Sequence, residues 1–287
     1  MNNSYVNLAS ITTYRFGGIC KNFIEITTED DLSKLPKNLN SENTFFLGKG
    51  SNVAFSDDEF QNYIIKSNLT YIKKNQSNGE IEIGSGYFLP DLSRYLKKHS
   101  LSGGEFLLGI PGSVGGGIKM NAGAWGFEFS SYLKKIKFYD LESKEIKEVD
   151  KNNFLFGYRQ SKNLDQKIII SGTFFFEPGD PIKIGQKMTE LNNLRKKSQP
   201  PALYNAGSVF KNSENYFAGE LIENAGLKGY SVGNVSVSKK HANFFIAKKG
   251  AKSQSLYDLV NYVKSEVFNK FGVQLEEEIL FVGNFKD

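Results

Sequence analysis

Gly103-Gly-Glu-Phe-Leu-Leu-Gly-Ile-Pro-Gly-Ser-Val-Gly-Gly-Gly-Ile-Lys-Met-Asn-Ala-Gly-Ala-Trp-Gly126 is the stretch around which the chain is organised. It holds nine of the 28 glycines, and apolar residues such as Leu107, Ile110 and Val114 frame them. Glycine lets the backbone approach a ligand closely and adopt positive φ. One interpretation is that successive backbone N–H groups bind the pyrophosphate of a nucleotide cofactor in a concave nest. The alternative is an ordinary glycine-rich loop between strands.

The whole chain has the composition of a globular protein. Its 287 residues exceed one typical domain and suggest two, with room for a small extra lobe. The N-terminal residues lack a signal-peptide pattern, and no run reaches 18 apolar residues. The single cysteine, Cys20, cannot form an internal disulfide. From these features we expect a soluble cytoplasmic protein without a membrane span.

The charge of the chain is mildly positive, at +5, with Lys and Asp or Glu interspersed. Such a balance suits ligands that carry phosphates, but an ordinary lysine-rich surface has the same net charge. No basic stripe with interleaved aromatic residues indicates a nucleic-acid partner.

The order of patterns predicts strands with glycine loops first and a helix-rich lobe second. Turn residues at Pro178–Pro181 mark the main boundary. The strands that we expect lie at 23–27, 44–47, 63–66, 80–86, 133–140, 145–149, 167–177 and 275–282. The helices that we expect lie at 29–35, 91–100, 182–197, 214–226 and 253–271.

A second glycine loop follows the predicted strand that starts at Thr44. This strand runs directly into Gly48, Gly50, Ser51 and Asn52, whose amides and hydroxyl are suited to phosphate or ribose. The loop matches neither the G-x-G-x-x-G fingerprint nor a P-loop. Taken alone, it is a weak signal.

Three further stretches carry polar groups that are able to do chemistry. Arg159 follows an aromatic residue, and Ser208 lies behind Gly207 with Lys211 and Asn212 close in sequence. In Leu275-Glu-Glu-Glu-Ile279, strand alternation places Glu276 and Glu278 on one face. Each stretch also has an ordinary explanation, namely a surface ion pair, a structural turn or solvated carboxylates.

The histidines do not indicate a metal site. His99 and His241 are too few, and no Cys or carboxylate spacing accompanies them. A catalytic triad is not supported by residue order either. We therefore expect no metal.

Seven motifs taken together are more specific than any of them alone. In order they are Thr13-Tyr-Arg-Phe-Gly-Gly18, Leu47-Gly-Lys-Gly-Ser-Asn52, Gly109-Ile-Pro-Gly-Ser-Val-Gly-Gly116, Met120-Asn-Ala-Gly-Ala-Trp-Gly126, Tyr158-Arg159, Ala206-Gly-Ser-Val-Phe-Lys-Asn212 and Leu275-Glu-Glu-Glu278. This series resembles the UDP-N-acetylenolpyruvoylglucosamine reductases, flavoenzymes of bacterial peptidoglycan precursor synthesis. The likeness covers nearly the whole chain, from about Thr13 to Gly283.

The resemblance implies an α+β protein with a p-cresol-methylhydroxylase-type FAD-binding domain of two subdomains and a C-terminal substrate-binding domain. The expected limits are 1–65, 66–180 and 181–287. The resemblance also implies that NADPH reduces FAD, which then gives a hydride to C3 of the enolpyruvyl group of UDP-N-acetylglucosamine enolpyruvate. Negative charge develops at C2 and its carboxylate, so a cation, hydrogen-bond donors and an acid are needed there.

The resemblance assigns roles to individual residues. Ser208 is the expected proton donor to C2, and Arg159 and Glu278 are expected to stabilise the enolic intermediate. Lys211 is a candidate for assisting proton loss from Ser208. Tyr158, Lys211 and Asn212 are expected to hold substrate, with Lys197 a looser candidate for the UDP phosphates. The expected FAD contacts are Leu47, Gly48, Lys49, Gly50, Ser51, Asn52, Val53, Gly109, Ile110, Pro111, Gly112, Ser113, Gly115, Gly116, Gly117, Asn121, Ala122, Gly123 and Ala124.

Some positions depart from the family pattern. They are Ser213, the turn Gly233-Asn-Val235 and Lys239, and they leave the fine substrate specificity open. The short segment between Glu177 and Ser208 indicates a compact class without a tyrosine-bearing lid loop. Because neither His99 nor Cys20 lies in a glycine loop, we expect non-covalent FAD. We also expect a monomer.

Three other readings of the same residues stay open. One is a different FAD-dependent oxidoreductase of the superfamily, which would keep the glycine loops but need neither Ser208 nor Glu278. Another is a non-enzymatic nucleotide-binding module that would tolerate Ser208→Ala. The last is a structural protein, which would bind no flavin.

Overall fold

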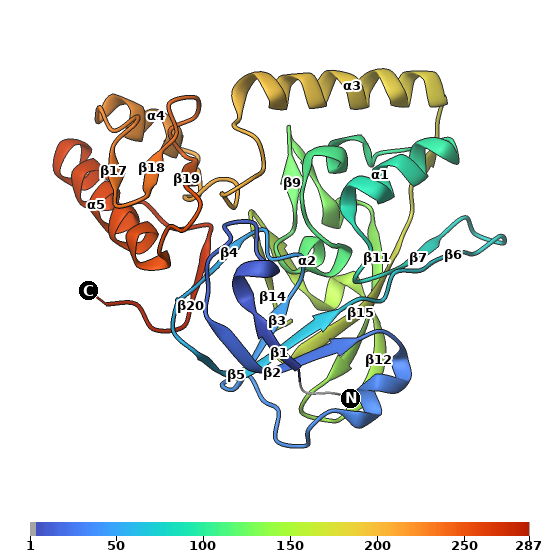
Figure 1. Cartoon of the computed structure of the whole chain (residues 1–287). Coiled ribbons are helices and arrows are strands. Elements are labelled where there is room, and N and C mark those ends of the chain that lie inside the picture. Colours follow the sequence, from blue (N-terminus) through green and yellow to red (C-terminus); the bar gives the residue numbers. More distant parts are fainter. Residues whose placement is uncertain (1–3, 287) are drawn as a thin grey trace. The chain divides into compact units, whose positions relative to one another are not determined.

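The computed structural model describes residues 4–286 and divides the chain into two compact units (Figure 1). Among these residues, the first unit comprises Ser4, Asn22–Lys49 and Asn62–Arg195, and the second comprises the remainder. The chain therefore passes between the units at 4/5, 21/22, 49/50, 61/62 and 195/196. The three domain limits expected from the sequence stay a prediction, and residues 1–3 and 287 within them lie outside the described residues.

The first unit contains a five-stranded antiparallel sheet. Its order is β12 (Glu145–Asp150), β11 (Leu133–Asp140), β15 (Lys167–Phe174), β7 (Ile81–Gly84) and β6 (Ile72–Lys74). The predicted hairpin 133–140/145–149 is confirmed as β11 and β12. Its turn forms because Asp140 Oδ1 accepts hydrogen bonds from the amides of Glu142 and Ser143.

Both faces of this sheet are buried. Helix α1 (Leu89–Lys98), which matches the predicted helix after Pro90, contributes Leu92 and Leu96 to the apolar cluster that contains the β7 residues Ile81 and Ile83. On the other face, Ile168 and Ile170 of β15 join a second apolar cluster. This burial on two sides explains the run of three isoleucines at 168–170 in β15.

A second sheet has the order β1 (Ser4–Asn7), β2 (Ile19–Ile26), β5 (Phe60–Ser67) and β3 (Thr44–Leu47). Strand β3 runs parallel to β5. The predicted helix after Thr28 is present as a short 3₁₀ helix, Glu29–Lys34. Asp31 accepts hydrogen bonds from the amides of Thr27 and Thr28, which fixes its first turn.

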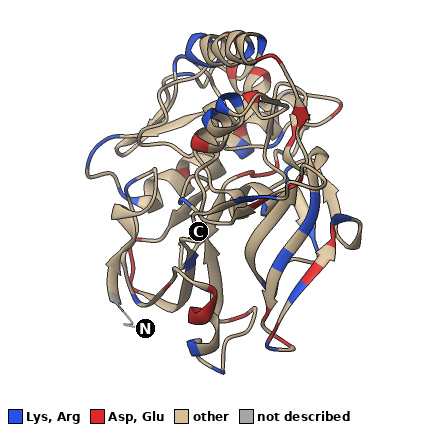
Figure 2. Ribbon diagram, turned by 90° about the vertical axis from the view of Figure 1, so that its right-hand side faces the viewer, with Lys and Arg blue, Asp and Glu red and all other residues tan. Residues whose placement is uncertain are grey.

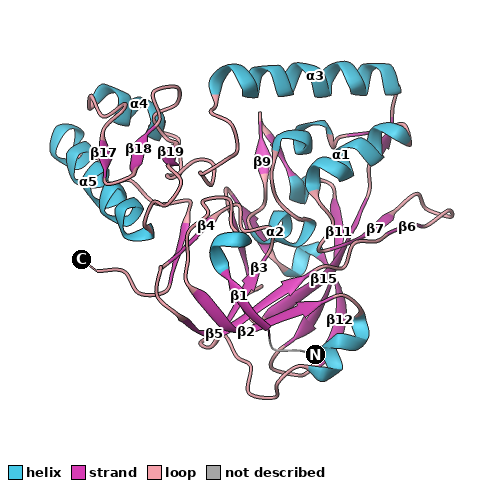
Figure 3. Ribbon diagram, in the orientation of Figure 1, coloured by secondary structure: helices cyan, strands magenta, loops and turns pink. Residues whose placement is uncertain are grey.

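The second unit is built around helix α5 (Ser253–Phe271), whose limits match the prediction. Its buried stripe includes Leu256, Val260 and Val263. Helix α4 (Ala218–Asn224) and strands β17 (Ser231–Val232), β18 (Val235–Val237) and β19 (Phe245–Ala247) complete the core (Figure 3). Among the described residues, no helix is long and apolar enough to cross a membrane.

Two predicted elements of the second unit are shorter than expected. The predicted helix 214–226 begins only at Ala218, because Ser213 donates its amide to the Tyr216 carbonyl in a preceding turn. The predicted strand 275–282 is regular only over β20 (Leu280–Val282), which pairs in parallel with β4 (Val53–Phe55).

The remaining elements are short, except for helix α3. The strands are β8 (Leu101–Ser102), β9 (Gly123–Ala124), β10 (Phe127–Glu128), β13 (Leu155–Gly157), β14 (Gln160–Lys162) and β16 (Glu177–Pro178). The helices are α2 (Val114–Lys119), α3 (Pro181–Ser198) and the 3₁₀ turns η1 (Leu8–Ser10), η3 (Glu105–Gly109), η4 (Phe129–Ser131) and η5 (Lys151–Asn153). Helix α3 confirms the predicted helix 182–197. Figure 2 shows both signs of charge interspersed along the ribbon, as in the sequence.

Candidate functional site

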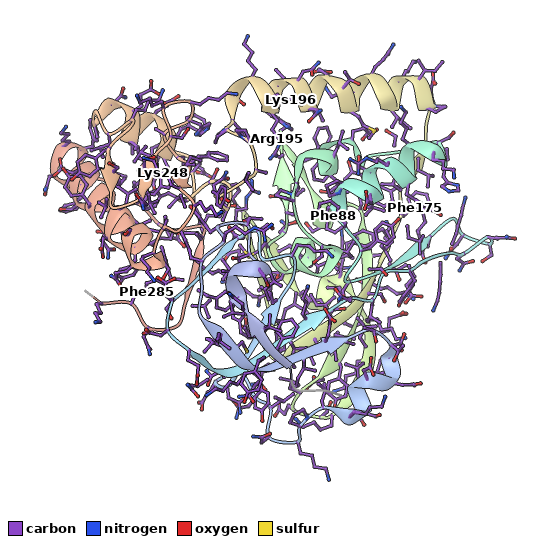
Figure 4. The ribbon with its side chains drawn as sticks, in the orientation of Figure 1. Phe88, Phe175, Arg195, Lys196, Lys248 and Phe285 are labelled. Atoms are coloured by element: carbon purple, nitrogen blue, oxygen red, sulfur yellow. The ribbon has the colours of Figure 1, made fainter. Side chains whose placement is uncertain are left out.

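The two glycine loops, far apart in sequence, meet in the first unit. Strand β3 ends at Leu47, and a Cβ added to Gly48 would lie 2.9 Å from Ser113 Oγ. Ser113 is the N-cap of α2, and its hydroxyl accepts the Gly116 amide over 3.4 Å. Phe88, labelled in Figure 4, forms a β-bridge with Ser113 and so holds this cap in place.

The glycine-rich stretch is partly a short helix, and most of its amides have protein acceptors. Gly115 donates to the Ser85 carbonyl over 2.8 Å, and Gly117 donates to the Ser113 carbonyl over 2.7 Å. A Cβ on Gly115 would lie 2.9 Å from Ser85 Cβ, and one on Gly117 would lie 3.0 Å from Phe129. These glycines therefore allow close packing. Gly116 differs, because among the described residues outside its own helix backbone only Ser113 Oγ lies within 4 Å of its Cβ position.

The turn after β3 presents amides that the protein itself does not use. Within residues 4–286, the amides of Gly50 and Ser51 donate to no protein acceptor. Gly50 has φ of +65°, and a side chain there would overlap the Ile11 carbonyl oxygen. Thr13 fixes the turn by donating its amide to the Gly50 carbonyl over 2.9 Å. Adjacent free amides of this kind form a concavity that binds anions.

Lys49 precedes this turn in the first unit. Burial, and then the charge of Lys66, lower the pKa of the Lys49 ammonium. A bound phosphate would offset both effects, because it would supply an opposite charge.

Arg159 occupies the turn of the β13–β14 hairpin. Its backbone is left-handed, with φ of +55°, as the tight turn requires. The guanidinium donates from Nη2 to the Gly123 carbonyl over 2.8 Å, and it lies 4.8 Å from the centre of the exposed Tyr158 ring. The structure therefore brings Tyr158 and Arg159 to the last glycine of the predicted FAD stretch.

Asn121 uses its side chain inside the protein. It is fully buried, and its Nδ2 donates to Glu128 Oε2 and to the Gly157 carbonyl, both over 3.0 Å. Its Oδ1 accepts the Ser130 amide over 3.1 Å. Asn121 thus anchors the Arg159 hairpin through the carbonyl of Gly157.

Arg195 is a candidate that we did not predict from the sequence. It leaves α3, as Figure 4 shows, and lies against Gly109, where a side chain would overlap its guanidinium. Burial, and then the charge of Arg159, lower the pKa of Arg195. Neighbouring cations of this kind attract an anion. From the same basic run we had selected Lys197, which is exposed, as is Lys196.

Ser208 is presented by a tight turn in the second unit. Gly207 has φ of +81° and no atom within 4 Å of its Cβ position, and its amide donates to Asn205 Oδ1 over 3.1 Å. Ser208 is half-buried, and among the described residues its hydroxyl has no hydrogen-bond partner. This hydroxyl is therefore available to a ligand.

Glu278 lies on the segment that pairs with the one after Ser208. The Glu278 amide donates to the Val209 carbonyl over 2.8 Å, and Phe210 and Glu277 form an antiparallel bridge. Leu275 and Ile279 are both buried, as alternation predicts for positions on one face, and Glu277 between them accepts a hydrogen bond from Lys264 over 2.7 Å. Two of the three predicted catalytic residues are thus on paired segments, and Arg159 belongs to the first unit.

The predicted substrate-binding side chains of the second unit have different surroundings. Lys211 is paired with Glu276. Asn212 accepts the Ala218 amide over 3.0 Å through Oδ1. Among the described residues, the Asn212 amide nitrogen and the Lys197 ammonium have no protein partner. These two donors are available to phosphate oxygens.

Other reactive side chains do not cluster. Among residues 4–286, no group of three or more His, Cys, Asp or Glu side chains is placed to hold a metal ion. Cys20 is fully buried in β2, and His99 is the C-cap of α1.

Two family models match the chain. The FAD binding domain matches residues 21–147, and the C-terminal domain of UDP-N-acetylenolpyruvoylglucosamine reductase matches residues 199–282. The chain is 35% identical over 287 residues to UDP-N-acetylenolpyruvoylglucosamine reductase of Prochlorococcus marinus subsp. pastoris, with 97% of this chain and 96% of that relative covered. It is 37% identical over 281 residues to the Aquifex aeolicus reductase, with 96% and 94% covered.

A solved structure matches the whole chain. It is UDP-N-acetylenolpyruvylglucosamine reductase from Thermus caldophilus, with a TM-score of 0.87 and 29% identity, and 99% of this chain and 100% of that chain are covered. Together with the FAD-binding match, this confirms the α+β class and the FAD-binding region followed by a C-terminal domain.

Proposed function

Because the chain belongs to the UDP-N-acetylenolpyruvoylglucosamine reductase family, we propose that it reduces UDP-N-acetylglucosamine enolpyruvate to UDP-N-acetylmuramate with electrons from NADPH. It is an FAD-binding oxidoreductase of the dehydrogenase class. The product is a peptidoglycan precursor, so the activity would serve cell-wall synthesis. This proposal rests on the position of Ser208. The residue after it, Val209, pairs with the segment that contains Glu278, and the Ser208 hydroxyl is available to a ligand.

The residues present fit FAD. The free amides of Gly50 and Ser51 suit its pyrophosphate, and Gly48 and Gly116 let backbone approach a flat group closely. When bound, FAD supplies a two-electron carrier between NADPH and the substrate. The residues that would hold FAD are those of 47–53, 109–113, 115–117 and 121–124. The Asn121 side chain would act indirectly, because it binds the backbone of Gly157 and Ser130.

Arg159 would stabilise the negative charge that develops on the enolpyruvyl carboxylate. Its guanidinium is held in place by the Gly123 carbonyl and the Tyr158 ring before substrate arrives. A preorganised cation lowers the barrier because it needs no reorientation as charge develops.

Ser208 would deliver a proton to C2 of the substrate, as its O–H bond breaks and a C2–H bond forms. The Glu278 carboxyl would act on the same enolic intermediate. The pairing of Lys211 with Glu276 favours a role for Lys211 in binding over the proposed assistance to Ser208. The substrate phosphates would meet Tyr158, Lys197, Lys211 and Asn212.

The visible spectrum of the purified protein tests this function. Under anaerobic conditions, NADPH should bleach the flavin absorbance, and UDP-N-acetylglucosamine enolpyruvate should restore it. A bleach without recovery would keep a flavoprotein but reject this substrate in favour of another FAD oxidoreductase. Protein that stays colourless after reconstitution with FAD would overturn the proposal. Light scattering during size-exclusion chromatography tests the proposed monomer.

A further inference from the structure

Asn243 binds the backbone directly after Ser208. It is 2% exposed, and its side chain bonds to both backbone groups of Phe210: Oδ1 accepts the amide over 2.9 Å and Nδ2 donates to the carbonyl over 2.8 Å. The Asn243 carbonyl also accepts the Val209 amide over 2.9 Å. Three hydrogen bonds thus tie Asn243 to the two residues that follow Ser208.

We propose that Asn243 is a positioning residue for Ser208. This inference rests on the proposed function, in which Ser208 is the proton donor. On the Asn243 side, the side-chain amide takes the place of a neighbouring strand, because it offers one acceptor and one donor to the same residue. On the other side, the Glu278 amide donates to the Val209 carbonyl. The backbone after Ser208 is therefore held from two directions.

Gly207, directly before Ser208, is held through its amide, which donates to Asn205 Oδ1 over 3.1 Å. Among the described residues, no non-neighbouring atom lies within 4 Å of the Gly207 Cβ position, so side-chain packing does not hold this residue. Among the described residues, the Ser208 hydroxyl also has no partner that would orient it. The direction of the hydroxyl hence depends on the backbone that Asn243 fixes. Proton transfer requires heavy atoms within about 2.6–3.2 Å, so a small displacement slows it.

Asn243 is itself held by the turn that carries it. His241 Nδ1 accepts the Asn243 amide over 3.2 Å, and the Phe244 amide donates to the His241 carbonyl over 3.0 Å. Ser238 Oγ accepts the amides of Lys240 and His241. This closed turn fixes the position from which Asn243 reaches Phe210.

The test separates the two half-reactions of the full-length holoenzyme in an anaerobic stopped-flow instrument. For Asn243→Ala, flavin reduction by NADPH should keep its wild-type rate, and flavin reoxidation by UDP-N-acetylglucosamine enolpyruvate should slow about 10–100-fold. Hydrogen exchange of the Phe210 amide should accelerate. If Asn243→Ala does not fold, Asn243→Asp carries the test, because it keeps the acceptor for the Phe210 amide and loses the donor. The control Val263→Ala, in the α5 core, should lower the melting temperature without changing reoxidation.

A double-mutant cycle with Ser208→Ala gives the decision. If Asn243 acts through Ser208, Asn243→Ala should slow reoxidation in the wild-type background and leave it unchanged in the Ser208→Ala background. The inference is overturned if Asn243→Ala slows reoxidation equally in both backgrounds. It is also overturned if Asn243→Ala leaves reoxidation unchanged in the wild-type background although Ser208→Ala alone is slow. Wild-type reoxidation by Ser208→Ala would instead overturn the proposed role of Ser208.

Discussion

Asn52 and Glu278 are 226 residues apart in sequence, yet the Asn52 Nδ2 atom donates to the Glu278 carbonyl oxygen over 2.9 Å. The Asn52 carbonyl in turn accepts the Leu280 amide over 3.1 Å. Asn52 therefore connects the turn with free amides to the segment that carries a proposed catalytic carboxylate. One N–H of its side-chain amide serves this connection.

Removal of this connection should affect the substrate half-reaction more than the NADPH half-reaction. Asn52→Ala leaves the Glu278 carbonyl without its side-chain donor, which should lower the free energy of unfolding by about 1 kcal/mol. Flavin reoxidation by the enolpyruvyl substrate should slow, because Glu278 loses a constraint. Urea unfolding and stopped-flow absorbance measure the two effects. The control Asn215→Ala, at an exposed position, should change neither the free energy of unfolding nor the rate of reoxidation. If Asn52→Ala slowed both half-reactions equally, the specific effect of Asn52 on the substrate half-reaction would be contradicted.

Arg159 should be intolerant even of lysine. Arg159→Lys keeps the charge but loses the planar group that bonds to the Gly123 carbonyl and stacks on Tyr158. We expect kcat to fall on the order of 10²-fold, within the range for removal of a preorganised donor. Steady-state kinetics with NADPH and the enolpyruvyl substrate measure this change. Arg94→Lys, which alters an exposed ion pair with Asp91, is the control for kcat. An unchanged kcat in Arg159→Lys would refute the role proposed for Arg159.

Gly50 should be required for both stability and FAD retention. Gly50→Ala combines a left-handed φ of +65° with overlap on the Ile11 carbonyl. Gly272→Ala is a matched control, because Gly272 has φ of +68° but no atom within 4 Å of its Cβ position. The control should lose about 1 kcal/mol of stability from backbone strain alone, and Gly50→Ala about 1–3 kcal/mol more from overpacking.

The ratio of flavin to protein absorbance after purification gives the second readout for this pair. It should fall for Gly50→Ala and stay at the wild-type value for Gly272→Ala. Equal unfolding free energies and equal flavin content in the two variants would show that the contact with Ile11 is unimportant.

Features encoded in local sequence were predictable. The limits of α5 follow from its apolar spacing and from Gly272, and the β11–β12 hairpin follows from alternation and turn residues. The roles proposed for Ser208 and Arg159, which stay predictions, came from the resemblance of the ordered motifs and not from composition. Neither residue has a distinctive neighbour pattern of its own.

Features that depend on tertiary contacts were missed. Gly115 and Gly117, which stay predicted FAD contacts, also permit α2 to pack on Ser85 and Phe129, and their local sequence does not show this packing. Arg195 and Asn243 carry no local signal, because their importance comes from Gly109 and Phe210, which are distant in sequence. The strand expected over 275–282 is regular only from Leu280. Before it, Glu277 forms an isolated bridge with Phe210, a partner distant in sequence that local alternation does not reveal.

His241 should make the stability of the protein depend on pH. Burial, and then the charge of Lys228, lower the pKa of His241, while Glu223 acts in the opposite direction. An unfolded chain binds the proton near pH 6.5, so between that pH and the lower folded pKa the unfolded state holds more protons. The free energy of unfolding should therefore fall as pH falls below about 6.5, by up to about 1.4 kcal/mol per pH unit. Protonation also removes the acceptor that His241 Nδ1 offers to the Asn243 amide.

Urea unfolding at pH 5.5 and 7.5 checks this expectation. The wild type should lose stability between pH 7.5 and 5.5, and His241→Gln should lose less because it cannot take up the proton. His99→Gln removes the chain's other histidine, which is exposed, and should keep the wild-type response of His241. An identical pH dependence in His241→Gln and the wild type would assign the effect to other groups. With only two histidines in the chain, the ring-proton resonances of these variants also identify the His241 titration directly by NMR.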